Sequence, residues 1–268
     1  MGIKSRLLRR YRDTRLEGPL PSWAAAQSRS SGYNDPAILS RVLEAAMSVK
    51  RGEAAFERDS VAKESPETQW QIIGAVGVAR ALEEPFTVLD FGGSLGSLYF
   101  QHREILRIMN LKSWTVVEQA HYVAAGQEFL SDGTLGFQAN IENVPSDEPA
   151  TLAIFSSVLH YLEDYLSPLR HVLNNQTPIV CIDRTFLTSS KDALVFMQIV
   201  PPNIYTASYP CWLIPETEIL GLFSEAGYTV VANYVNDPFP AVNARGGTFG
   251  GFIAVSDECL SPDVTGRA

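Results

Sequence analysis

Residues 88–96 decide the fold, and their sequence is Val88-Leu89-Asp90-Phe91-Gly92-Gly93-Ser94-Leu95-Gly96. The apolar run ends at Asp90, glycines follow at positions 92, 93 and 96, and a helical pattern begins near Leu98. Glycine has no Cβ atom, so glycines here let the backbone turn sharply and let a ligand approach it closely. The stretch therefore predicts a strand, a tight turn and a helix, with a ligand held at the turn. A turn with a purely structural role is the alternative.

The chain beyond this stretch alternates short apolar runs with helical patterns. The runs that predict strands are residues 87–91, 114–118, 152–155 and 179–183. Such alternation is typical of βαβ units, which build a parallel sheet. Two later strand-like runs, 228–234 and 251–255, are joined by a Pro- and Gly-rich stretch without a helical pattern, so we expect them to pair antiparallel. The expected fold class is α/β, with a doubly wound, mostly parallel sheet that ends in an antiparallel strand pair.

The first 84 residues depart from this alternation. We expect a basic segment and linker over residues 1–33, a helical extension over 34–84, the main domain over 85–256 and a tail over 257–268. Up to Arg15 the chain mixes basic and apolar side chains. This mixture predicts peripheral contact with an anionic membrane surface or an acidic partner, and a solvated terminus is the alternative.

Composition and charge argue against several classes of protein. The 268 residues are 46% hydrophobic and 19% charged, and no apolar run reaches the roughly 18 residues that a membrane-spanning helix needs. A net charge of -9 argues against nucleic acid as a partner, because binding to phosphates depends on clustered Lys and Arg. Cys181, Cys211 and Cys259 are too widely spaced for a disulfide framework or a zinc site. We therefore expect no metal and a cytoplasmic location.

Glu118 ends the second expected strand, at the point where the following helix begins. A carboxylate in this position can accept both hydrogen bonds of a ribose diol. A negative charge favoured by the helix dipole is the alternative. Because the strand follows the glycine turn, the position favours a ligand-binding role.

Together these segments resemble the class I, Rossmann-like S-adenosylmethionine-dependent methyltransferases. That family's first motif is an acid, a variable residue and spaced glycines, which residues 90–96 match except that Ser94 stands where a middle glycine is usual. After the third strand the family usually has Asp near the adenine amine, and this chain has Asn140 there. The resemblance covers about residues 87–255 and implies S-adenosylmethionine as the cofactor. The residues that it implies for cofactor binding are Asp90, Gly92, Gly93, Ser94, Gly96, Glu118, Asn140, Ile141 and Ser157.

A narrower resemblance rests on residues 56–60, 154–162 and 207–212. These segments are similar to those of a poorly characterised bacterial group of methyltransferases that is often found with surface-polysaccharide genes. The similarity implies O- or N-methylation of a glycan, a glycolipid precursor or a small metabolite, and a role in polysaccharide biosynthesis. It also favours Glu57, Arg58 and Asp59 as residues that close over the cofactor, with a solvated charge run as the alternative.

Few residues are candidates for the chemistry itself, because in-line methyl transfer depends mainly on alignment, which can supply about 7 to 11 kcal/mol. A general base is needed only where the acceptor must lose a proton. His160, just after the fourth strand, is the leading candidate, with packing or cofactor contact as the alternative. Asp183 at the end of the next strand is the second, with an internal salt bridge to Arg184 as the alternative. The residues expected to bind the acceptor are Tyr161, Arg184, Tyr205, Tyr209 and Trp212, with core packing as the alternative for the aromatic ones.

Two other functions remain open. An NAD(P)-dependent oxidoreductase also uses a glycine turn followed by an acid, but the glycines here lack the G-x-G-x-x-G spacing. A catalytically silent protein that binds adenosylmethionine is the second alternative, and Ser94 and Asn140 are the departures that motivate it.

Overall fold

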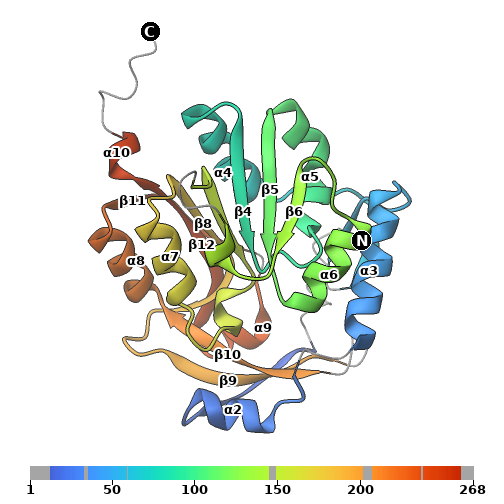
Figure 1. The fold of residues 1–268 in the computed structure, drawn as a ribbon. Helices are drawn as coiled ribbons and strands as arrows, with labels where there is room; N and C mark the ends of the chain where they lie inside the picture. The colour runs from blue at the N-terminus through green and yellow to red at the C-terminus, as the bar shows by residue number, and fades with distance from the viewer. Residues whose placement is uncertain are drawn as a thin grey trace.

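A ten-stranded sheet forms the centre of the computed structural model (Figure 1). The structure describes residues 13–32, 36–58, 60–144, 149–201, 207–236 and 238–260. In sheet order the strands are β1 (Arg15–Leu20), β9 (Leu194–Ile199), β10 (Ser208–Pro215), β8 (Ile179–Thr188), β7 (Leu152–Ser156), β4 (Phe86–Phe91), β5 (Leu111–Val117) and β6 (Leu135–Gln138), while β12 (Gly247–Ser256) joins β11 (Tyr228–Val235) to β8. A separate two-stranded hairpin consists of β2 (Phe56–Arg58) and β3 (Val61–Lys63).

The strands β8, β7, β4, β5 and β6 are parallel neighbours. The four expected strands coincide with β4, β5, β7 and β8, so the prediction of a mostly parallel sheet is confirmed. From β4 the chain first builds β5 and β6 on one side, and then returns to place β7 and β8 on the other. In sheets of this kind, ligands bind at the carboxyl ends of the strands where the order reverses, which here is the edge formed by β4 and its neighbours.

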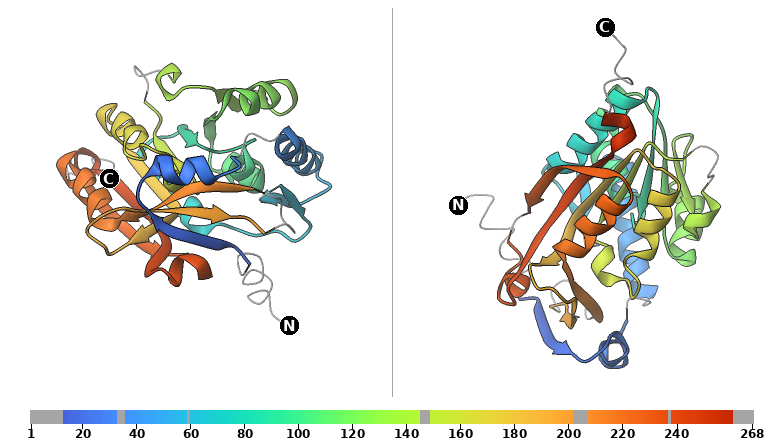
Figure 2. Two further views of the ribbon diagram at one scale, coloured as in Figure 1. Left: turned by 90° about the horizontal axis from the view of Figure 1, so that it is seen from below. Right: turned by 90° about the vertical axis from the view of Figure 1, so that its left-hand side faces the viewer.

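Helices cover both faces of the sheet, as the doubly wound prediction requires (Figure 2). Neighbouring residues of a strand face opposite sides, and accordingly Val88 and Leu89 of β4 belong to two different core clusters. One cluster contains side chains of α3 (Pro36–Lys50), α4 (Trp70–Leu82), α5 (Ser97–Ile108) and α6 (Ala120–Phe129), and the other contains those of α7 (Ser167–Asn174) and α8 (Glu216–Glu225). The helices α3 and α4 lie within residues 34–84, where the sequence predicts a helical extension.

The expected antiparallel end of the sheet is also present. β11 pairs antiparallel with β12, and β12 pairs antiparallel with β8. One correction concerns the connection between β11 and β12, which contains the four-residue helix α9 (Pro240–Asn243). One helical turn is too short for the crossover that parallel pairing would require, so the antiparallel pairing stands.

The expectation of a linker before residue 34 is wrong for residues 15–29. This segment forms β1, which pairs antiparallel with β9, and α2 (Trp23–Arg29), whose first turn is capped by the Ser22 hydroxyl. The partner strand β9 lies far along the chain, and its hairpin with β10 was not predicted either. Local sequence cannot reveal a strand of this kind, because its hydrogen-bond partner comes from a distant segment.

No helix within the described ranges is both long enough and apolar enough to cross a membrane. The basic segment of residues 1–12, to which the predicted membrane or partner contact belongs, lies outside the described residues.

Candidate functional site

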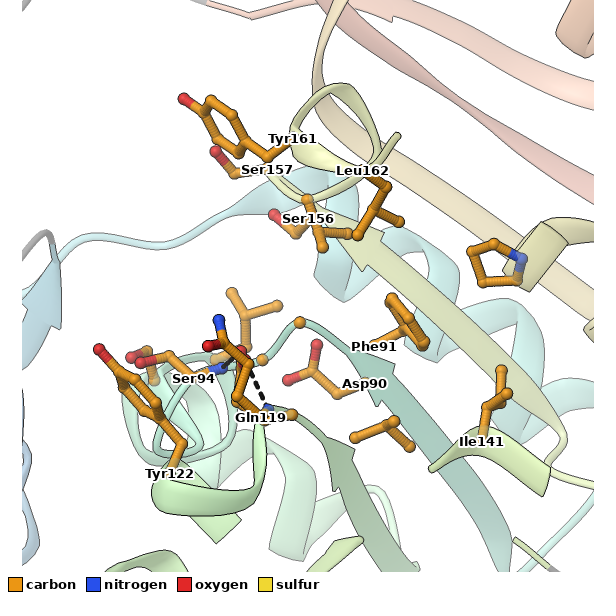
Figure 3. Close-up of a pocket in the computed structure, with 18 of the residues that line it drawn as sticks. Asp90, Phe91, Ser94, Gln119, Tyr122, Ile141, Ser156, Ser157, Tyr161 and Leu162 are labelled. Carbon is orange, nitrogen blue, oxygen red and sulfur yellow. Dashed lines mark hydrogen bonds between the residues drawn. The ribbon is translucent and has the colours of Figure 1, made fainter. Parts of the chain in front are cut away.

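A cavity of about 850 Å³ lies at the carboxyl ends of β4, β5 and β7 (Figure 3). Its lining comes from distant parts of the sequence, including the β2–β3 hairpin, the glycine turn and the segments after β5, β6 and β7. Of the residues that the sequence implicates in cofactor binding, those that line it are Asp90, Gly92, Gly93, Ser94, Glu118, Asn140, Ile141 and Ser157. Gly96 is set back from the cavity and caps the start of α5.

The glycine turn crosses the floor of this cavity. Gly92 has φ +73°, and a Cβ atom there would overlap Val158, while one on Gly93 would overlap the Asp90 carboxylate. Both glycines are therefore required by the close packing of the turn itself. Ser94 adopts φ 55°, a conformation that favours glycine. Ser94, at the position where the resembling family usually has its middle glycine, is thus held in a left-handed conformation.

Asp90 is the last residue but one of β4, and Figure 3 shows its carboxylate directed towards the cavity. The indole Nε1 of Trp114 donates a hydrogen bond of 3.1 Å to Oδ2. Oδ1 is buried and has no hydrogen-bond partner among the described residues. Burial is the main cause that raises the pKa of Asp90 from 3.8 to about 7. The hydrogen bond from Trp114 lowers this pKa, and the charge of Glu118 raises it further. The site therefore holds a carboxyl oxygen that a bound donor could satisfy.

Glu118 follows β5 and joins that strand to the glycine turn. Its Oε2 accepts a 3.3 Å hydrogen bond from the Ser94 amide, and its Oε1 accepts one of 2.9 Å from the Gln119 amide. Burial is the main cause of a raised pKa for this carboxyl group. Each oxygen of a carboxylate can accept more than one hydrogen bond, so Glu118 retains capacity for a ligand.

An apolar part of the lining lies beyond Glu118. It contains Ile141, which is buried, together with Phe91, Leu162 and Pro168, while the exposed side chain of Asn140 adds an amide. Sequence reasoning missed Phe91, Leu162 and Pro168, because no local signal distinguishes an apolar side chain that lines a cavity from one that packs in the core.

Both catalytic candidates lie behind the cavity wall. His160 is fully buried, with ring centroids 4.0 Å from Tyr161 and 3.9 Å from Phe186. Burial, and secondarily the charge of Arg184, holds its pKa well below the usual value. Asp183 is also buried and accepts hydrogen bonds from Ser156 Oγ (2.9 Å) and Asn236 Nδ2 (3.1 Å). The placement of His160 favours a role in packing. The placement of Asp183 favours a role in orienting Ser156, which lines the cavity.

The expected acceptor residues divide into two groups. Tyr161, Arg184 and Tyr209 line the cavity, and the two tyrosine rings meet edge to face at 5.1 Å. Trp212 does not line it, because its ring stacks on Trp23 of α2. Tyr205 and Asp59 lie outside the described residues.

At the other end of the cavity, Glu57 and Arg58 of the β2–β3 hairpin line the wall. Gln69 and Gln101, which sequence reasoning missed, lie on the same wall and are hydrogen bonded to each other at 3.2 Å. No group of three or more His, Cys, Asp or Glu side chains that could hold a metal ion is found in the described parts of the chain.

Comparison with known proteins finds no matching family model and no matching curated protein. Among solved structures, human N-acetylserotonin methyltransferase in complex with SAM is similar at 16% identity and a TM-score of 0.45, over 70% of this chain and 51% of that one, so this chain spans about half its length. The 1,6-didemethyltoxoflavin N1-methyltransferase of Burkholderia thailandensis is similar at 18% identity and a TM-score of 0.41, over 84% and 92%. A sugar N-methyltransferase from Streptoalloteichus is similar at 14% identity and a TM-score of 0.46, over 69% and 86%.

Proposed function

We propose that this chain is an S-adenosylmethionine-dependent methyltransferase that acts on a small acceptor molecule. One observation carries the proposal: Asp90, near the end of β4, and Glu118, directly after β5, line one cavity together with the glycine turn, and the Ser94 amide links that turn to Glu118. An acid on each of two adjacent parallel strands, with a close-packed turn between them, suits a nucleoside that carries a positively charged group.

The residues present fit such a cofactor. The Glu118 carboxylate would accept hydrogen bonds from a ribose diol. Ile141 and Phe91 offer apolar surfaces for the adenine ring, and Asn140 offers an amide near its amine. The unsatisfied Oδ1 of Asp90 offers an acceptor for a donor of the bound molecule. A cavity of about 850 Å³ has room for a cofactor with a small acceptor beside it.

The cofactor would supply an electrophilic methyl group, and the protein would supply alignment. Tyr161, Arg184 and Tyr209 would hold the acceptor at the end of the cavity beyond Ser157. His160 and Asp183 do not reach the cavity, so we propose that they support its wall without exchanging a proton with the acceptor. Alignment of donor and acceptor, worth about 7 to 11 kcal/mol, would then be the main source of rate.

The nature of the acceptor is a separate part of the proposal. The narrower sequence resemblance supports a glycan or glycolipid precursor and a role in surface-polysaccharide synthesis, with a small metabolite as the alternative. Aromatic side chains such as Tyr161 and Tyr209 suit either a sugar ring or a planar molecule.

The charges around the turn argue against a dinucleotide cofactor. An oxidoreductase would place a pyrophosphate at the glycine turn and the start of the following helix. Here the buried Glu57 carboxylate accepts a hydrogen bond from Ser97, the first residue of α5. A carboxylate at that position repels a pyrophosphate, whereas it attracts the positively charged groups of adenosylmethionine.

Calorimetric titration tests the proposal. Adenosylmethionine and adenosylhomocysteine should bind, and NADH should bind more weakly or not at all. Glu118→Gln should weaken adenosylhomocysteine binding by roughly 10- to 100-fold, because hydrogen bonds to a charged group contribute about 1.5 to 3 kcal/mol. The control Glu128→Gln changes an exposed glutamate on α6 and should leave affinity unchanged. Preferential binding of NADH would contradict the proposal.

A turnover assay separates an enzyme from a silent binding protein. Labelled adenosylmethionine is incubated with cell-envelope precursors and with a panel of small metabolites, and adenosylhomocysteine formation is measured. Turnover that depends on an added acceptor supports the enzyme and identifies the acceptor class. Tight binding of the cofactor with no turnover on any acceptor would favour the silent protein.

A further inference from the structure

The β2–β3 hairpin brings two opposite charges to the cavity wall beside the glycine turn. Glu57 and Arg58 are consecutive residues of β2, and both line the cavity. The hairpin precedes the parallel sheet in the sequence, yet Phe56 and Glu57 are buried. Contacts of β2 with α3 and α5 hold the hairpin against the main domain.

Glu57 is fixed at the start of α5. Its side chain accepts a 2.8 Å hydrogen bond from the Ser60 amide, which belongs to the turn of the same hairpin, and another from the Ser97 hydroxyl. Ser97 directly follows Gly96, the last glycine of the turn. Glu57 as a whole is only 6% exposed, so its negative charge acts in a partly dehydrated space where electrostatic attraction is strong.

Arg58 is fixed by different contacts. Its Nη1 lies 2.6 Å from Glu67 Oε1, its guanidinium lies 5.0 Å from the centre of the Phe56 ring, and its side chain is 10% exposed. The positive charge of Arg58 acts on nearby His102. Burial is the main cause that lowers the pKa of His102 to about 4, and the charge of Arg58 lowers it further. A guanidinium held in this way presents a planar set of donors that suits a carboxylate.

We propose that Glu57 and Arg58 form the subsite for the α-amino-acid end of the cofactor, with its carboxylate towards Arg58 and its ammonium group towards Glu57. The inference rests on the proposed function, in which the nucleoside lies by Glu118 and Asn140. The remainder of the molecule then passes over the glycine turn towards α5, where Glu57 and Arg58 lie. Two adjacent side chains of opposite charge match a zwitterion, and the neighbouring Ser60, Gln69 and Gln101 keep that end of the cavity polar.

Two ligands that differ only at this end give the decisive measurement. Adenosylhomocysteine contains the amino-acid group, whereas 5′-methylthioadenosine keeps the nucleoside and the thioether without it. Calorimetry on the wild-type protein should show adenosylhomocysteine binding about 10- to 100-fold more tightly. Arg58→Gln and Glu57→Gln should each remove most of that difference, because each should lower the affinity for adenosylhomocysteine. The affinity for methylthioadenosine should change less than about twofold.

The control variant is Arg51→Gln, which makes the same change at an exposed arginine paired with Glu53 outside the cavity. It should leave both affinities unchanged. If Arg58→Gln or Glu57→Gln lowers the affinity for both ligands by the same factor, the residue supports the pocket as a whole and the inference is wrong. If neither ligand binds to the wild-type protein, the proposed function fails instead.

A second test uses the wild-type protein alone and does not depend on the folding of a variant. The decarboxylated analogue of adenosylhomocysteine keeps the amine and lacks the carboxylate that Arg58 would bind. It should bind at least about tenfold more weakly than adenosylhomocysteine. Equal affinities of the two ligands would overturn the role assigned to Arg58.

Discussion

At the scale of single residues, Asp90 shows how a buried carboxyl group with one unsatisfied oxygen lowers stability at neutral pH. Its carboxyl group is buried, one oxygen is bonded to Trp114, and the other has no hydrogen-bond partner among the described residues. Burial raises its pKa from 3.8 to about 7, so the folded protein retains a proton that the unfolded chain releases. The contribution of Asp90 to stability therefore falls as the pH rises from about 4 to about 7.

Asp90→Asn should be more stable than the wild type at pH 8 and should bind the cofactor more weakly. The amide oxygen can still accept the Trp114 bond, while the cost of a buried charge disappears. Since one pKa unit corresponds to about 1.4 kcal/mol, the gain in the free energy of unfolding is at most roughly 4 kcal/mol. Urea unfolding at pH 4 and pH 8 measures it, and calorimetry measures the affinity. A variant less stable than wild type at pH 8 would contradict this account.

His160 is a second buried titratable residue, and its effect on stability has the opposite sign. Its pKa is lowered by burial, so the folded protein holds the neutral ring, while the unfolded chain binds a proton below about pH 6.5. Its contribution to stability is therefore lost as the pH falls below 6.5.

His160→Phe should keep the aromatic packing and remove this pH dependence. The free energy of unfolding should fall less between pH 7 and pH 5 than in the wild type, and turnover should stay within a few-fold of wild type. His121→Gln, at an exposed position on α6, is the matched control. A loss of turnover of 100-fold or more, with the fold intact, would restore His160 as the general base.

At the scale of elements, the amino-terminal strand and helix support the wall of the cavity. β1 pairs with β9, and Trp23 of α2 stacks on Trp212 of β10 with ring centroids 5.4 Å apart. Trp212 in turn donates a 3.0 Å hydrogen bond to the carbonyl oxygen of Leu162, which lines the cavity. The role of Trp212 is thus indirect, and it acts through the position of the cavity wall.

Trp23→Ala should release α2 and loosen the β9–β10 hairpin. Removing a buried tryptophan side chain costs about 3 to 5 kcal/mol, and here the loss should appear as faster hydrogen exchange in residues 15–29, 194–199 and 208–215. Cofactor affinity should change little, because the glycine turn and Glu118 lie on other elements. Trp70→Ala, at a site 71% exposed on α4, should change neither quantity. Unchanged exchange in Trp23→Ala would show that α2 is held by other contacts.

At the scale of the whole molecule, the cavity exists because the sheet order reverses at β4. The reversal leaves the carboxyl ends of β4, β5 and β7 side by side, and the hairpin of β2 and β3 and the strand β10 add further wall residues. A ligand that binds across these elements would stabilise the folded protein as a whole by mass action. Under the proposed function, the cavity would divide into a nucleoside end at Glu118, an amino-acid end at Glu57 and Arg58, and an acceptor end at Tyr161 and Tyr209.

The sequence by itself determined the parallel sheet, its antiparallel end, and the strand and turn of residues 88–96 with the helix that follows them. These features depend on alternation and on glycine spacing, which are local properties of the chain. For the same reason the motif residues Asp90, Ser94 and Glu118 could be expected at one cavity, since the carboxyl ends of parallel strands meet at one edge.

Only the tertiary structure decided the pairing of β1 with β9, the burial of His160 and Asp183, and the meeting of Glu57 with Ser97. The pairing of β1 with β9 and the meeting of Glu57 with Ser97 depend on contacts between segments that lie far apart in the chain. The burial of His160 and Asp183 depends on whether a side chain points into the cavity or away from it. Local periodicity contains no information about either, because the energy that fixes them comes from packing and hydrogen bonding between elements that are already formed.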